Sequence, residues 1–391
     1  MTEIADVFNQ YGQAYIDKHN LSQEEIKVIN SISSCRTSKL GGHVDVCDSC
    51  GHLRISYNSC RNRHCPKCQG LLKEKWIEDR KKDLLPIQYY HIVFTIPNDL
   101  NDLALRNKNE IYSLLFKASA ETLKELASDP KHLGANIGFI SVLHTWGQNL
   151  MDHPHIHCIV TGGGLSLNSK KWVSSKKNFF IPVKVISSLF RGKFMYYLKH
   201  KYYNNKFVFP GKINSLQKES NFQKLVDILY DKNWVVFSKP SFKNPKFVIE
   251  YLGRYTNKVA ISNNRIIKMK NGKVTFKYKD YSDNNKTKFM TLDAFEFIRR
   301  FLLHVLPKRF VRIRYYGLLS NRFRKENLKL SRFLLNVFTN NIDKPPAKES
   351  WQEILFRLTG KDLSICPECG KGKMIRKNEL NYIRPSPPMA C

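Results

Sequence analysis

The chain has 391 residues, with 65 Lys and Arg against 33 Asp and Glu, which gives a formal net charge of +32. A chain of this length can form two or three domains with a buried core, and a positive excess of this size indicates a polyanionic partner, most often nucleic acid. No run approaches about 18 apolar residues and the N-terminus has no apolar core, so the sequence disfavours a membrane-spanning or secreted protein and predicts a cytoplasmic one.

Predicted helices and strands are interleaved along the chain. The predicted helices cover residues 1–34, 71–84, 99–127, 183–203, 245–258, 292–304 and 323–337. The predicted strands cover residues 88–96, 136–146, 154–161, 232–238 and 309–316. Asn271 and Gly272 lie between two alternating segments and predict a hairpin within residues 265–280. This order of elements favours an α+β fold with helices on one face of the sheet.

Ten cysteines are present, and six of them lie between Cys35 and Cys68. Such clustering is typical of metal binding in a reducing compartment rather than of a disulfide framework. The pairs Cys47-x2-Cys50 and Cys65-x2-Cys68 are separated by 14 residues, which is close to the spacing of a zinc site built from two knuckles. We therefore expect these four thiols to bind one structural zinc ion; the alternative is that they are free core cysteines.

Further metal-ligating residues are interleaved with these pairs. A second zinc site could be formed by Cys35, His43, Cys60 and His64. The alternative is that the histidines are ordinary surface residues. Arg61 and Arg63 lie among the cysteines, and arginines on a zinc-stapled module are suited to contacting DNA phosphates or bases. A purely structural role for this module is the competing interpretation.

A histidine-rich strand follows in the middle of the chain. His153, His155 and His157 alternate with apolar residues, so on a strand they point to one face while their neighbours point into a core. Two histidines at i and i+2 can hold one metal ion. On the preceding strand, Gln148 is the first candidate for a third ligand and His144 the second. Two imidazoles and an amide oxygen suit Mg²⁺ or Mn²⁺; the alternative is a polar strand face with satisfied histidines.

Two tyrosines four residues apart lie on the predicted helix 245–258. Tyr251 and Tyr255 share one helical face, which on its own is typical of a packing pair in a core. Arg254 and Lys258 bring positive charge to the same helix, and Gly253 allows another group to approach it. A tyrosine beside a metal-polarised phosphate is what phosphotyrosine chemistry requires.

The C-terminal part contributes a basic segment and a further cysteine pair. Residues 299–332 contain eleven Lys and Arg and one acidic residue, and Arg312 and Arg314 are the candidate DNA contacts. Aromatic residues among them could stack on bases, and the alternative is a solvated basic face. Cys366-x2-Cys369 is half of a zinc ribbon for which a fourth ligand is not evident, with the C-terminal cysteine, residue 391, as the candidate third.

Taken together, these motifs resemble those of the two-tyrosine HUH rolling-circle transposases of the insertion-sequence family numbered ninety-one. The matching stretches are residues 59–69, 144–157, 251–263 and 312–317, in the family's order. The resemblance implies a ferredoxin-like antiparallel sheet preceded by a small zinc-binding domain. It implies that His155 and His157 bind the catalytic metal and that Tyr251 and Tyr255 are the nucleophiles, which would cleave single-stranded DNA.

The expected organisation is a zinc-binding DNA-recognition domain (1–85), a catalytic domain (86–335) and a C-terminal tail with the second cysteine pair (336–391). The expected function is DNA transposition through a 5′-phosphotyrosine, with no nucleotide cofactor. Host replication machinery is the expected further partner, and the protein is expected to associate with the nucleoid when it acts. The alternatives are a non-catalytic zinc-finger DNA-binding protein and a metal hydrolase in which the tyrosines play no part.

Overall fold

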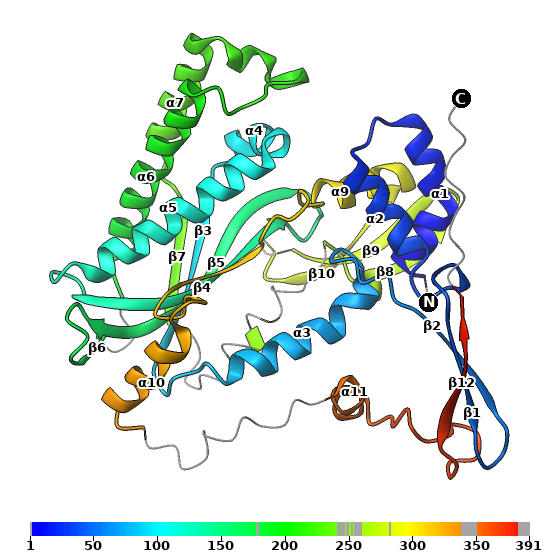
Figure 1. Cartoon of the computed structure of the whole chain (residues 1–391). Coiled ribbons are helices and arrows are strands. Elements are labelled where there is room, and N and C mark those ends of the chain that lie inside the picture. Colours follow the sequence, from blue (N-terminus) through cyan, green and yellow to red (C-terminus); the bar gives the residue numbers. More distant parts are fainter. Residues whose placement is uncertain are drawn as a thin grey trace. The chain divides into compact units, whose positions relative to one another are not determined.

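A computed structural model describes residues 2–176, 180–240, 247, 250, 251, 253, 260–280, 283–337 and 350–381 (Figure 1). The chain forms two compact units. Unit 1 comprises Met1–Trp76, Asn257–Val305 and Asp343–Cys391, and unit 2 comprises Ile77–Thr256 and Leu306–Ile342. The structure therefore groups the C-terminal segment with the N-terminal one, whereas the functional boundaries expected near residues 85 and 335 follow the order of the chain and stay a prediction.

Unit 2 is built around an antiparallel sheet. Its strands are β3 (Tyr89–Thr95), β4 (Ala135–Trp146), β5 (Asp152–Ser166), β6 (Trp172–Ser174), β7 (Val236–Pro240) and β11 (Ile313–Gly317). The spatial order is β11-β4-β5-β3-β7, and β6 pairs with β5. The long strands β4 and β5 form a hairpin at the centre, as the sequence predicts for residues 136–161.

The helices of unit 2 include α4 (Asn101–Arg106), α5 (Lys108–Ser128), α6 (Val183–Tyr203), α7 (Glu219–Asp231) and α10 (Arg324–Leu334). Helix α3 (Pro66–Lys81) enters this unit at its C-terminal end. Residues 247, 250, 251 and 253 are also helical, and most of the predicted helix 245–258 lies outside the described residues. Figure 1 shows α4, α5 and α6 along one side of the sheet. The side chains that β3 and β5 direct toward these helices, such as Ile92, Phe94 and Ile156, belong to one buried apolar cluster. We call this the core face, and the α+β class with an antiparallel sheet is confirmed.

The opposite face of the same sheet is polar at its centre. The register pairs Thr95 with His155 and Val93 with His157, so these side chains lie on one face together with His91. We call this the histidine face. The pairing register also places Tyr315 of β11 on this face. Helices α3 and α10 contact the face there, because the guanidinium groups of Arg80 and Arg324 lie 5.5 Å and 5.7 Å from the ring centroid of Tyr315.

Unit 1 contains helices and two three-stranded sheets. Its elements are α1 (Ile4–Lys18), α2 (Gln23–Ser33), β1 (Gly42–Cys47), β2 (Leu53–Tyr57), β8 (Ile266–Lys270), β9 (Lys273–Asp280), β10 (Lys286–Asp293), α9 (Ala294–Leu303), α11 (Trp351–Thr359) and β12 (Met374–Leu380), together with most of α3. In the described parts of both units, short 3₁₀ turns cover Ser38–Leu40, Asn98–Leu100, Gly211–Gln217 and Asn263–Arg265. Phe8 of α1 packs edge-on against Phe301 of α9.

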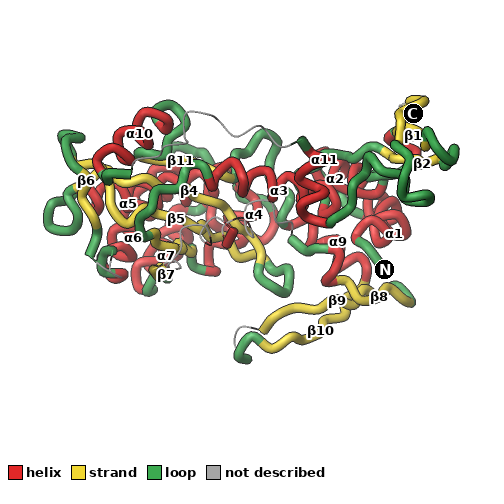
Figure 2. The backbone as a smooth tube through the Cα atoms, turned by 90° about the horizontal axis from the view of Figure 1, so that it is seen from below, coloured by secondary structure: helices red, strands yellow, loops and turns green. Residues whose placement is uncertain are grey.

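The ribbon of β8, β9 and β10 lies beside α9 (Figure 2). Asn271 and Gly272 form its first turn with positive φ angles of 51° and 71°, the left-handed conformation that an Asn-Gly hairpin needs. The predicted hairpin is confirmed. At the start of α2, Ser22 and Glu25 cap each other's backbone N–H groups, which fixes the N-terminus of that helix.

The second small sheet joins distant parts of the chain in the order β12-β1-β2. None of these strands is predicted from the sequence, because all are short, β1 carries Gly and Cys, and β12 is rich in charged residues. Among the described residues, no helix is both long and apolar enough to cross a membrane.

Candidate metal centres and nucleophile

Three imidazoles converge at the centre of the histidine face. His144 of β4 lies directly opposite His155 of β5, and its Nδ1 is 3.2 Å from His155 Nε2. His155 Nε2 is in turn 3.0 Å from His157 Nε2, and all three side chains are buried. Neighbouring ligands of a six-coordinate divalent ion at about 2.1 Å are roughly 3 Å apart, so these residues, the histidine group, fit one metal ion.

Hydrogen bonds orient two of these rings. His155 Nδ1 donates to the carbonyl oxygen of His153 at 2.6 Å, so the lone pair of this ring is on Nε2. His157 Nδ1 is 2.8 Å from His91 Nε2, and when His157 donates here its own Nε2 is also available. Metal-ligating histidines characteristically donate their second N–H to a carbonyl or another acceptor in this way.

Burial also sets the charge of these rings. It lowers the pKa of His155 to about 4, and likewise lowers the pKa of His91 to about 4. Both rings are therefore neutral at pH 7, which is the state that a metal ligand and its hydrogen-bond partner require.

The structure brings His155 and His157 together with His144, whereas Gln148 stays a prediction. Gln148 was the first candidate because it shares the period-2 face of His144 in an extended strand. However, β4 ends at Trp146, and Gln148 lies in the turn before β5, where that periodicity no longer applies. The structure therefore favours His144, the alternative that the sequence left open.

His91 is a site residue that the sequence analysis missed. The strand containing it was predicted, and His91 is the one imidazole within it, alternating with the apolar residues of the core face. That alternation was a usable signal, because it places His91 on the face that carries His157.

Tyr251 lies against this group. Its ring centroid is 5.1 Å from that of His91, with the planes at 74°, so one of the two predicted nucleophiles is on the histidine face. Tyr255, Arg254 and Lys258 lie outside the described residues. Gly253 is described, and a Cβ at this position would come within 2.4 Å of Ile77 Cδ1. The group that approaches this glycine is therefore the α3 side chain rather than a ligand.

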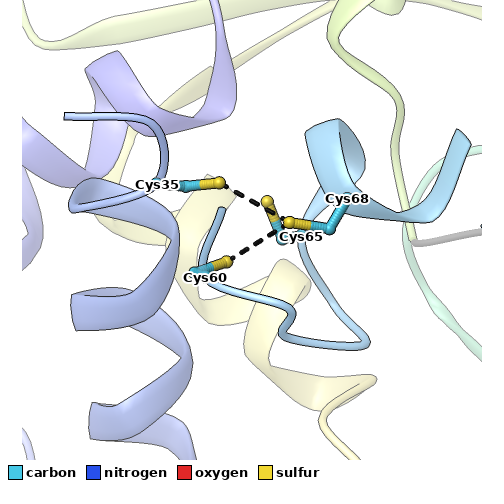
Figure 3. Close-up of side chains that lie close together, drawn as sticks. All are labelled: Cys35, Cys60, Cys65 and Cys68. Atoms are coloured by element: carbon cyan, nitrogen blue, oxygen red, sulfur yellow. Dashed lines mark hydrogen bonds between the residues drawn. The ribbon is translucent and has the colours of Figure 1, made fainter. Parts of the chain in front are cut away.

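Four thiols of unit 1 form what we call the first cysteine group: Cys35, Cys60, Cys65 and Cys68. Figure 3 shows the side chains pointing toward one another from the end of α2, the loop after β2 and the start of α3. The Sγ atoms of Cys35 and Cys60 are each 3.6 Å from Cys68 Sγ. Ligands of a tetrahedral zinc with Zn–S bonds of about 2.3 Å are roughly 3.8 Å apart, so this set fits zinc. Hydrogen bonds from the neighbouring thiols, led by Cys35, lower the pKa of Cys68.

The remaining thiols form the second cysteine group: Cys47, Cys50, Cys366 and Cys369. Here Cys47 Sγ is 3.7 Å from Cys369 Sγ, and Cys50 Sγ is 3.7 Å from Cys366 Sγ. A hydrogen bond from the Gly372 N–H leads the effects that lower the pKa of the Cys369 thiol to about 6.

This division corrects both predicted zinc sets. Cys47 and Cys50 do not join Cys65 and Cys68, because they lie at the tip of the β1–β2 hairpin while the first group gathers at its base. Two strands of five or six residues separate tip from base by about 15–20 Å. In the described residues neither group contains a histidine, so His43 and His64 belong to neither set. His43 Nε2 lies 3.6 Å from Asp45 Oδ2, and the backbone N–H of His64 donates to Asn62 Oδ1.

The predicted DNA contacts lie in different environments. Arg61 is exposed beside the first cysteine group, and burial lowers the pKa of nearby Arg63. The guanidinium of Arg314 lies 4.1 Å from the ring centroid of Phe116, on the core face, and Arg312 is half-buried just before β11. Arg80 and Arg324, which lie over the Tyr315 ring, are two basic residues on the histidine face, and Lys239 of β7 shares this face because it pairs with His91; none of the three was named as a site residue from the sequence.

Comparison with known proteins gives concordant matches. Residues 138–327 match the family described as "Putative transposase", and residues 7–96 match the "Transposase zinc-binding domain". The chain is 48% identical over 374 residues to "Putative transposase y4qJ" of Sinorhizobium fredii, covering 95% of this chain and 94% of that protein. It is 28% identical over 321 residues to "Transposase for insertion sequence element IS801" of Pseudomonas savastanoi pv. phaseolicola, covering 80% and 75%. No solved structure matches. The first match contains the histidine group and Tyr251, and the second contains the first cysteine group.

Proposed function

The chain belongs to the transposases of the insertion-sequence family numbered ninety-one, and on this premise we propose that it cleaves and rejoins single-stranded DNA at the ends of a mobile element through a 5′-phosphotyrosine. The observation that carries the proposal is the position of Tyr251. Its ring contacts His91, His91 is hydrogen-bonded to His157, and His157 belongs to the converging histidine group.

The residues divide into a metal-binding set and a nucleophile. His144, His155 and His157 would hold a divalent cation, which when bound polarises a phosphate by Lewis-acid action. Three imidazole nitrogens form a softer donor set than the two imidazoles and one amide oxygen expected from the sequence. Mg²⁺ prefers oxygen ligands, whereas Mn²⁺ accepts imidazole nitrogen more readily. We therefore place Mn²⁺ ahead of Mg²⁺ for this site.

Tyr251 supplies the attacking oxygen. The bond between this oxygen and phosphorus forms while the bond from phosphorus to the DNA 3′-oxygen breaks, and the proton lost by the tyrosine is balanced by the one gained by the 3′-hydroxyl. The phosphate stays on the 5′ side, linked to the protein. Attack by a 3′-hydroxyl on that linkage rejoins DNA and releases the tyrosine. One phosphoester replaces another at each step, so no nucleotide cofactor is needed. Tyr255 is proposed as the second nucleophile.

DNA is held by basic residues of both units in this proposal. Arg80 and Arg324 would contact the strand that reaches the histidine face. Arg61 and Arg63 would contact DNA beside the first cysteine group, whose structural zinc stabilises that part of the zinc-binding domain. Arg312 and Arg254 with Lys258 remain proposed contacts, whereas Arg314 is engaged with Phe116 and would contribute less. Host replication machinery is a proposed further partner, and the site of action is the cytoplasmic nucleoid.

The test is trapping of the covalent intermediate. Full-length protein is incubated with Mn²⁺ and a single-stranded oligonucleotide that spans an element end, and the adduct is measured on a denaturing gel. We expect Tyr251→Phe to reduce the adduct strongly and the double change with Tyr255→Phe to abolish it. Tyr278→Phe, in β9 of unit 1, is the matched control and should leave the yield unchanged. A normal adduct from the double variant would overturn the nucleophile assignment. Wild-type binding without any adduct would favour the non-catalytic alternative.

A further inference from the structure

We propose that the second cysteine group binds a zinc ion of its own, which fastens the C-terminal segment of the chain to the β1–β2 hairpin. Two of its ligands, Cys366 and Cys369, lie outside the matched zinc-binding domain of residues 7–96. The proposal concerns metal binding and does not depend on the proposed DNA chemistry.

The spacing of the four thiols matches one tetrahedral ion. Their Sγ atoms all lie within 4.8 Å of one another, and the two cross-pairs are 3.7 Å apart, compared with roughly 3.8 Å expected between thiolates on one zinc. Sulfur atoms in a disulfide would be about 2.05 Å apart. Four thiols that bind no common ion have no reason to gather around one point, so this spacing indicates a shared metal ion.

The two halves of the group have the same local structure. Each is a Cys-x2-Cys-Gly turn, and the glycines, Gly51 and Gly370, have positive φ angles of 72° and 65°. In each turn this glycine's N–H donates to the carbonyl of the first cysteine, Cys47 or Cys366. Backbone N–H groups also approach sulfur, from Cys50 to Cys47 Sγ at 3.5 Å and from Gly372 to Cys369 Sγ at 3.4 Å. Donors of this kind stabilise thiolate ligands, and the pair of turns is the arrangement of two zinc knuckles facing each other.

The chain beyond the second turn is shaped to reach the first. Gly372 lies so close to the hairpin that a Cβ there would come within 2.3 Å of Cys47 Sγ. The next residue, Lys373, donates its N–H to Asp48 Oδ1 at 2.8 Å, and its carbonyl accepts from the Asp48 N–H at 3.1 Å. A side chain at residue 372 would force these groups apart.

Strand pairing continues the connection away from the thiols. β12 pairs antiparallel with β1 from Cys47–Met374 to Gly42–Leu380, with one bulge between Val44 and Asp45. The buried Asp45 carboxylate accepts from Arg54 of β2 at 2.9 Å and lies 3.9 Å from Arg376 of β12. The segment that the sequence suggested as a tail is thus the third strand of the zinc-binding hairpin.

The experiment measures zinc per chain in full-length protein purified under reducing conditions. We expect two equivalents in the wild type and one in the double variant Cys366→Ser/Cys369→Ser. Cys391→Ser removes the cysteine that the sequence suggested as a partner of this pair, and Cys158→Ser removes a buried cysteine of β5. Both are matched controls and should retain two equivalents. Hydrogen exchange of residues 374–380 should become at least about tenfold faster in the double variant, while α1 keeps its protection.

Three results would overturn the proposal: a single zinc in the wild type, two equivalents in the double variant, or loss of one equivalent in Cys391→Ser. If the double variant is insoluble, Cys369→His decides, because histidine replaces cysteine in many zinc sites. This variant should fold and keep two equivalents, and a fall to one would count against the site. Replacing zinc with Co²⁺ in the wild type gives an independent readout, in which two all-thiolate sites are expected and one would contradict the proposal.

Discussion

The cysteine groups of unit 1 and the histidine group of unit 2 are both suited to metal, but they differ in how completely they surround it. Each cysteine group offers four thiols, which complete a tetrahedral shell and leave no position for a substrate. The histidine group offers three imidazoles, and Tyr251 lies beside it against His91. A closed shell is typical of structural sites, and an incomplete one is typical of catalytic sites.

The ligand sources differ in the same sense. The histidine ligands come from the two strands of one hairpin, where the register of β4 and β5 fixes their separation. The thiols come from turns and loops next to helices and strands, and in the second group the two cysteine pairs are more than 300 residues apart in sequence. The rigid sheet can therefore hold its ligands before the metal binds, whereas the thiol sites depend on the metal for their structure.

The largest expected effect separates these two roles. Replacing both His155 and His157 with Ala should reduce adduct formation by at least about 10³-fold, because the metal contributes several kcal/mol to phosphate activation. Zinc content and single-stranded DNA binding should stay within about twofold of the wild type. Gel assays, metal analysis and binding titrations measure the three quantities.

His132→Ala, in the loop after α5, is the matched control and should behave like the wild type. If the double variant loses a zinc equivalent, the histidine group is a structural zinc site like the cysteine groups, and the contrast between the two kinds of site is wrong. Unchanged adduct formation would remove the catalytic metal from this face altogether.

Much of the histidine face could be predicted from the sequence because its geometry is local. Alternation along one strand places His155 and His157 on a common face, and the preceding strand supplies His144. The expectation for Gln148 extends the alternation past Trp146, where β4 ends. Strand ends depend on turn hydrogen bonds, here from Gly147 N–H to the carbonyl of Met151, which periodicity does not reveal.

The partners of the cysteines could not be predicted in the same way. The spacing of Cys47-x2-Cys50 and Cys65-x2-Cys68 correctly indicates two knuckles, yet it contains no information about the hairpin that separates them. The pairing of β1 with β12 brings Cys366 to Cys50 across most of the chain. One signal was available: both pairs of this group share the pattern Cys-x2-Cys-Gly, whereas Cys68 is followed by Gln69.

A smaller effect is expected at His91, and it tests whether the open site is held in advance. His91→Ala removes the hydrogen-bond partner of His157 Nδ1, so the ring can turn and the lone pair on Nε2 would no longer be directed at a bound metal ion. Loss of such a partner typically weakens metal binding 10–100-fold. Titration with Mn²⁺, followed by electron paramagnetic resonance, measures the affinity directly.

His91→Gln keeps a hydrogen-bond acceptor and should recover part of the lost affinity, which a merely space-filling role would not explain. Neither cysteine group includes His91, so the zinc content should be the same in the wild type, His91→Ala and His91→Gln. Equal Mn²⁺ affinity in His91→Ala and the wild type would mean that the β4–β5 register alone positions the ligands.

The smallest expected effect concerns Asp152, a buried carboxyl near the histidine group that lowers the stability of unit 2. The cysteine groups of unit 1 have the opposite effect, because metal binding adds stability there. Asp152 begins β5 and is buried, and within the described residues neither carboxylate oxygen has a hydrogen-bond partner. Burial raises the pKa of this carboxyl to about 7, although Lys108 opposes the shift. Since this pKa lies above the ordinary value of 3.8, the folded protein keeps a proton that the unfolded chain releases, and stability falls as the pH rises from about 4 to about 7.

Asp152→Asn removes this loss, so we expect it to stabilise the protein by about 1–3 kcal/mol at pH 8 and to have little effect at pH 4. Denaturant unfolding at the two pH values measures the difference, with the exposed Asp231→Asn as a control that should change stability by less than about 0.5 kcal/mol. An equal gain at both pH values would show that packing, rather than the buried charge, limits the stability of this end of β5.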